Sequence, residues 1–113
     1  MRKKLIIDIR DYASKIADRE EASLTETIRK HKKAIIKDLI DCIDRIPLHD
    51  PHITSKVSYK LDVKNREVVV TYDWDEQSNV NTWMHNVDKN LIRICDYLWA
   101  NTPFKCYHTP NVI

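Results

Sequence analysis

The sequence contains no glycine in its 113 residues, and this absence excludes several classes of site. Average usage of glycine is about 7%. Phosphate-binding loops, dinucleotide fingerprints and the nucleophile elbow of hydrolases all need glycine, because a Cβ obstructs the backbone conformations or the close approach that they require. We therefore expect no nucleotide-dependent enzyme built on these motifs. Positive-φ positions are expected to fall to Asn or Asp, which tolerate them best after glycine.

Cysteine and long hydrophobic runs are also scarce. The three cysteines, Cys42, Cys95 and Cys106, form no CxxC motif, and their odd number is typical of free thiols. No apolar stretch approaches the roughly 18 residues of a membrane span. Asp8 and Arg10 interrupt the first apolar run too early for a signal peptide. We therefore expect no membrane association and a cytoplasmic location.

Charge and composition indicate a globular protein without a dominant electrostatic character. Hydrophobic residues make up 42% of the chain and charged residues 32%, which are values of folded domains. The net charge of +2 is too small to predict a polyanionic partner on its own. The length predicts a single domain that spans residues 1–113.

Residues 53–74 carry the most definite pattern in the chain, because apolar and polar residues alternate along two arms. The apolar members are Val57, Tyr59, Leu61, Val63, Val68, Val70, Tyr72 and Trp74. This period of two predicts an antiparallel hairpin with one apolar face. We predict a register that places Val63 opposite Val68, with a two-residue loop at Asn65-Arg66. Arg66 is poorly suited to the positive φ of such a loop.

Three segments have helical spacing, at about residues 4–18, 24–46 and 80–99. Ser23 followed by Glu26 fits a capping box at the start of the second helix. No proline or glycine enforces a break between the first two helices, so separate and continuous helices both remain open.

A hairpin alone is not stable in water, so helices must cover its apolar face. We predict a small α+β domain in which two N-terminal helices precede the hairpin. The long C-terminal amphipathic helix then packs on the apolar face of the sheet. Residues 104–107 are a candidate third strand, at an edge.

The last helix has residues that lie away from its apolar stripe. These residues are Asp88, Ile92, Tyr97 and Trp99. A large aromatic such as Trp99 in this position either packs under the C-terminal tail or offers an anchor to a partner. We therefore predict a protein interface here, with another protein or a second copy of the chain.

A basic run on the second helix supports an alternative, nucleic-acid binding. Its members are Arg29, Lys30, Lys33 and Lys37. The opposing interpretation is a solvated helix face, because Glu26 precedes Lys30 by four residues and Asp41 follows Lys37 by four.

The weakest candidate is a metal site for a metal-dependent enzyme at His49 and His52, with Cys106 and His108 as further ligands. Polar loop residues are the favoured interpretation of the two histidines, and we expect no cofactor. By elimination, the sequence favours a non-enzymatic protein-binding module, such as an inhibitor, adaptor or regulatory subunit. Nucleic-acid binding is the second hypothesis.

Overall fold

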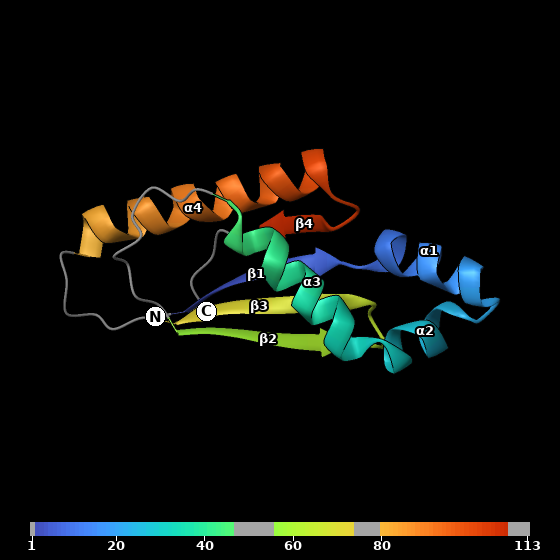
Figure 1. Ribbon diagram of the computed structural model, residues 1–113. Helices are drawn as coiled ribbons and strands as arrows, with labels where there is room; N and C mark the ends of the chain where they lie inside the picture. The colour runs from blue at the N-terminus through green and yellow to red at the C-terminus, as the bar shows by residue number, and fades with distance from the viewer. Residues whose placement is uncertain (1, 47–55, 74–79, 109–113) are drawn as a thin grey trace.

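The computed structural model describes residues 2–46, 56–73 and 80–108, and side chains within 3–46, 57–73 and 89–107. The elements in chain order are β1 (Arg2–Asp8), α1 (Arg10–Glu20), α2 (Leu24–Lys30), α3 (Lys32–Asp44), β2 (Lys56–Asp62), β3 (Glu67–Asp73), α4 (Val80–Asn101) and β4 (Lys105–His108). All neighbouring strands are antiparallel, in the order β2-β3-β1-β4 (Figure 1). This order, with β1 between β3 and β4, is the split β-α-β arrangement of ferredoxin-like domains.

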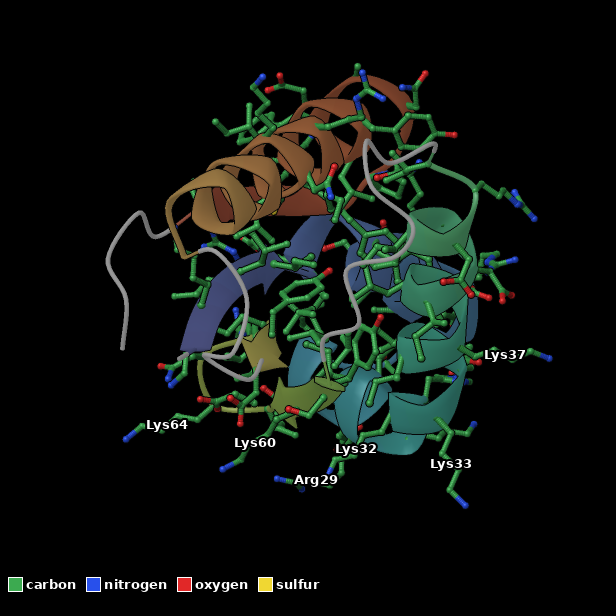
Figure 2. The ribbon with its side chains drawn as sticks, turned by 90° about the vertical axis from the view of Figure 1, so that its left-hand side faces the viewer. Arg29, Lys32, Lys33, Lys37, Lys60 and Lys64 are labelled. Atoms are coloured by element: carbon green, nitrogen blue, oxygen red, sulfur yellow. The ribbon has the colours of Figure 1, made fainter. Side chains whose placement is uncertain are left out.

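One face of the sheet is covered by α3 and α4, and side chains fill the space between them (Figure 2). α4 lies along β4, while α3 contacts α4 and β2. α1 and α2 lie beyond the end of the sheet (Figure 1). The buried core residues are Leu5, Ile7, Ile9, Ala13, Ile28, Ile35, Leu39, Ile43, Ile46, Val68, Val70, Leu91, Ile94, Cys95, Leu98, Phe104 and Cys106. The predicted α+β class is therefore confirmed.

The predicted first helix is wrong over residues 4–9, because residues 2–8 form the strand β1 and α1 begins only at Arg10. Leu5 and Ile7 are fully buried, whereas Ile6 between them is only partly buried. That is the period of a strand with one face in the core. β1 pairs with β3 on one side and with β4 on the other, so a central sheet position decides its conformation. The candidate tail strand is confirmed as β4.

The predicted hairpin is present, but its register differs by two residues. Leu61 pairs with Val68, where we expected Val63. The loop therefore has four residues, 63–66, in place of two. Because the shift is even, the side chains of β2 and β3 stay on their expected faces. Val57, which we expected to be covered, is 41% exposed at the edge strand, and Trp74 lies outside the described residues. Val68 and Val70 are buried.

The turn itself explains the longer loop. The Asp62 carboxylate accepts hydrogen bonds from the backbone N–H (3.1 Å) and the side-chain amide (2.8 Å) of Asn65. Arg66, with φ 56°, takes the left-handed position. The other left-handed residue of the described chain is Glu21, with φ 53°, at the end of α1. The expectation that Asn or Asp would take these positions is therefore wrong.

The helices before the hairpin are separate, which answers the question that the sequence left open. α1 ends at Glu20, and the Ser23 hydroxyl caps α2 by accepting from the Glu26 N–H at 3.2 Å. The predicted second helix is divided at His31, where α2 ends and α3 begins. None of the described helices is long and apolar enough to cross a membrane.

Candidate functional site

α4 has an inner face in the core and an outer face with large apolar side chains. Leu91, Ile94 and Leu98 are buried, in keeping with the apolar stripe. On the outer face Ile92 is 49% exposed and Trp99 is 48% exposed. These two residues are seven positions apart, so they share one side of the helix. Of the predicted interface residues, Asp88 lies on α4, but its side chain is outside the described part of the chain.

Three contacts with β4 hold Trp99 in place. Its Nε1–H donates to the backbone carbonyl of Cys106 at 2.7 Å. The Lys105 Nζ lies 4.8 Å from the centre of the Trp99 ring. The Tyr107 ring meets it edge to face, with centroids 6.0 Å apart. Trp99 therefore contacts its own tail, as one of the two interpretations expected, but half of its surface remains exposed.

Tyr107 is a member of this surface that the sequence did not predict. It is 51% exposed and pairs with Ile6 across the β1–β4 ladder. Lys105 and Tyr107 are two positions apart on a strand, so both project from the same face of the sheet. The alternation in the tail was a signal, but the contact with Trp99 depends on how β4 pairs.

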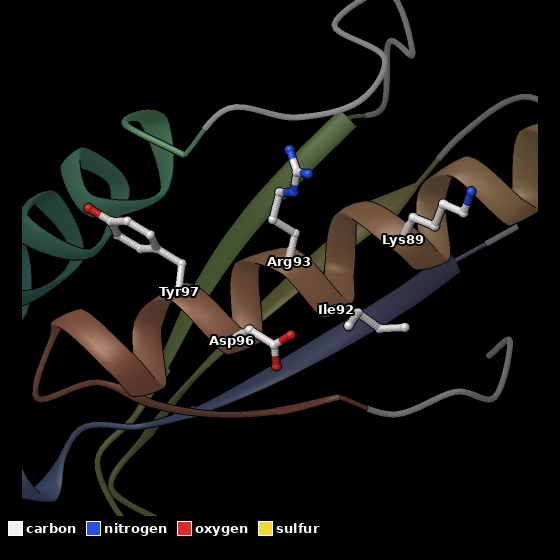
Figure 3. Close-up of a pocket in the computed structure, with 5 residues that line it drawn as sticks. All are labelled: Lys89, Ile92, Arg93, Asp96 and Tyr97. Atoms are coloured by element: carbon white, nitrogen blue, oxygen red, sulfur yellow. The ribbon is translucent and has the colours of Figure 1, made fainter.

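A shallow hollow of about 510 Å³ lies on the outer surface of α4. Its lining residues are Lys89, Ile92, Arg93, Asp96 and Tyr97 (Figure 3). Ile92 supplies an exposed aliphatic centre, and charged groups of both signs surround it. The predicted residues Ile92 and Tyr97 are thus brought together. Lys89, Arg93 and Asp96 were not predicted, because charged residues on an exposed helix face give no distinguishing signal.

The cysteines do not form a reactive site at this surface. All three are free thiols, as expected. The buried Cys95 and Cys106 share a hydrogen bond, which lowers the pKa of Cys95, and together with burial it raises the pKa of Cys106. Burial also raises the pKa of Cys42. The raised pKa values keep Cys42 and Cys106 protonated and poorly nucleophilic at neutral pH. Cys95, whose pKa is lowered, is buried.

The predicted basic residues lie at the other end of the molecule, on α2 and α3. Lys30 forms an ion pair with Glu20 of α1, at 3.7 Å between Nζ and Oε2. The ion pairs expected from i,i+4 spacing, Glu26 with Lys30 and Lys37 with Asp41, do not form between these described residues. Arg29, Lys33 and Lys37 project away from the protein (Figure 2).

The candidate metal ligands His49 and His52 lie outside the described residues. Within the part of the chain that the structure describes, no group of three or more His, Cys, Asp or Glu side chains is placed to hold a metal ion.

Comparison with known proteins returns no match to any family model, curated protein or solved structure.

Proposed function

We propose that this chain is a non-enzymatic protein-binding module, of the inhibitor, adaptor or regulatory-subunit kind. The binding surface consists of the outer face of α4 and the adjoining edge of β4. The observation that supports it is the gathering of exposed apolar side chains. Of the described residues, four large hydrophobic side chains are exposed, and three of them, Ile92, Trp99 and Tyr107, lie on these two elements.

The environment of Trp99 favours a binding anchor. Its indole is fixed by the hydrogen bond to Cys106 and by the ring contact with Tyr107. A side chain that is already ordered loses little conformational entropy when a partner covers it. Tryptophan and tyrosine are also the residues most enriched among those that dominate binding energy.

The hollow around Ile92 indicates the chemistry of the partner. An apolar side chain fits against Ile92, and groups of both charges fit beside Lys89 and Asp96. A second copy of the chain meets this requirement. If two α4 helices pack antiparallel about Ile92, Lys89 of each copy faces Asp96 of the other. Such a self-complementary patch is what a two-fold symmetric interface requires. Self-association is therefore the first interaction to test.

Sedimentation velocity over a range of protein concentrations tests self-association, and affinity capture from the native host tests other partners. The test variant is Ile92→Asp. The matched control is Val57→Asp, because Val57 is a similarly exposed aliphatic residue (41%) on β2, at the opposite edge of the sheet.

We expect Ile92→Asp to weaken association at least tenfold, since a charge would be buried against apolar surface. Val57→Asp should leave association unchanged. The proposal fails if the chain is monomeric and no captured protein is lost with Ile92→Asp. It also fails if Val57→Asp has an equal effect.

A further inference from the structure

A second hollow, of about 720 Å³, lies between the start of α1, the helix α2 and the β2–β3 loop, and the charged residues among its described lining are all cations. Its lining residues are Arg10, Thr25, Arg29, Val63, Lys64, Asn65 and Arg66. Four of the seven are cations, and none is Asp or Glu. The concentration of positive charge in a concave site attracts anions more strongly than the net charge of the chain indicates.

The fold brings these cations together from distant parts of the sequence. The N–H of Ile9 donates to the carbonyl of Arg66 at 3.1 Å, which fastens the hairpin loop to the junction between β1 and α1. Arg10 follows directly. Its guanidinium contacts the Asp8 carboxylate at 2.6 to 3.1 Å, so its direction is fixed while other N–H groups stay available.

Nearby carboxylates offset only part of this charge. Asp8 forms an ion pair with Arg10 and so neutralises one of the four cations. Asp62 accepts two hydrogen bonds from the neutral amides of Asn65 and keeps its own negative charge. Arg29, Lys64 and Arg66 form no ion pair with another described residue, so the hollow keeps a positive balance. Glu26 is on α2 but does not line the hollow.

More cations continue from the hollow across the surface of α3 and β2. The outward-pointing ones are Arg29, Lys32, Lys33, Lys37, Lys60 and Lys64 (Figure 2). None of these six forms an ion pair with another described residue. We call the hollow and these cations the basic surface. Unpaired like charges repel one another, so a polyanion laid across them relieves that repulsion.

We propose that the basic surface binds the phosphate backbone of double-stranded nucleic acid. The spread of cations over α2, α3 and the hairpin suits a row of phosphates better than a single phosphate group. Contacts of this kind position a duplex without reading its sequence. Duplex DNA carries one charge per about 1.7 Å of its axis, which is dense enough to engage several of these cations together.

Single strands fit less well, because their binding proteins stack bases on aromatic side chains. None of the described residues that line the hollow is aromatic. On the open face of the sheet, the central strands place Lys4, Ile6, Val69 and Thr71 where sheet-based RNA-binding modules carry aromatics. The basic surface shares no residue with the proposed protein-binding surface, so either proposal stands or fails alone.

The experiment is fluorescence anisotropy with the full chain and a 20-base-pair duplex, at salt concentrations from 50 to 300 mM. If about five phosphates are engaged, the slope of log K against log salt is about −4 to −5. Arg29→Glu and Lys64→Glu should each weaken binding about five- to tenfold at 50 mM salt and make the slope shallower by about one. The matched control is Lys15→Glu, which changes the net charge equally at an exposed position of α1 that belongs to neither proposed surface.

Lys15→Glu should change affinity by less than twofold, and circular dichroism should show that all three variants remain folded. No binding at 50 mM salt would overturn the proposal. Equal losses for Lys15→Glu and Arg29→Glu would also overturn it, since net charge alone would then explain the binding. Tighter binding of single strands than of duplex, or binding of heparin alone, would assign the basic surface to another class of polyanion.

Discussion

Replacing Trp99 measures how much the contacts with β4 contribute to stability. Trp99→Ala removes a neutral hydrogen bond worth about 0.5–1.5 kcal/mol and an edge-to-face ring contact of about 0.5–1.5 kcal/mol. It also removes an exposed cation–π contact with Lys105 of about 0.5–1 kcal/mol. Because 48% of Trp99 is exposed, we take the lower half of these ranges and expect a loss of about 2 kcal/mol. Trp99→Phe keeps a ring and should lose about 1 kcal/mol.

Urea unfolding followed by circular dichroism at 222 nm measures both losses. A loss below about 0.3 kcal/mol for Trp99→Ala would refute the reasoning, because the contacts with β4 would then contribute nothing. A loss above about 4 kcal/mol is typical of a fully buried core residue. Such a loss would contradict the role of Trp99 as an exposed binding anchor.

The same variants distinguish binding from stability. If Trp99 is an anchor, Trp99→Ala should cost about 2 kcal/mol of binding free energy, or about 30-fold in affinity. Thr102→Ala is the matched control, because the Thr102 hydroxyl donates to the carbonyl of Leu98 at 2.7 Å and its loss weakens the same end of α4. Thr102→Ala should leave binding nearly unchanged. An equal loss of binding for both variants would show that Trp99 acts through the stability of the tail.

Three further predictions concern the fold. Glu21→Gly should raise the free energy of unfolding by about 0.5–1 kcal/mol in urea, because glycine adopts the left-handed cap more easily, and a loss would contradict this. Ile7→Ala should destabilise by about 2–4 kcal/mol and Ile6→Ala by about 1 kcal/mol, and equal effects would contradict a strand at β1. Burial acts to raise the pKa of Asp8, but the hydrogen bonds and charge of Arg10 outweigh it and lower the pKa. The stability that Asp8 adds over Asp8→Asn should therefore be full above the ordinary value of 3.8 and lost as pH falls below it, and a difference that does not shrink in unfolding measurements from pH 2 to 6 would contradict this.

The local spacing of apolar residues predicted which face of each helix or strand is buried better than it predicted which strands and residues pair. Alternation in the hairpin fixed which residues point to the core, and that result is unaffected by an even shift of register. The register itself depends on the turn, where Asp62 binds Asn65 and the left-handed position moves to Arg66. Nothing in the alternation distinguishes a two-residue loop from a four-residue loop.

The N-terminal strand β1 shows that the spacing of apolar residues does not always distinguish a strand from a helix. Leu5, Ile6, Ile7 and Ile9 are close enough together to satisfy a helical or a strand period. Pairing with β3 and β4 selects the strand, and both partners are far away in the sequence. The same limit applies to Lys30, whose partner is Glu20 on a different helix, and not Glu26 one turn away.

The two candidate surfaces differ in how far each can be predicted from the sequence. The outer face of α4 follows from helical spacing alone, so Ile92 and Trp99 were recognisable as residues outside the apolar stripe. The basic hollow exists only because the hairpin loop is fastened beside the start of α1, which places Arg66 next to Arg10. A surface that lies on one helix can be predicted from the sequence of that helix. A surface that forms where distant segments of the chain meet can be identified only once the fold is known. The two surfaces share no residue, because one is built from α1, α2, α3 and the β2–β3 hairpin and the other from α4 and β4, and each can therefore change without altering the residues of the other.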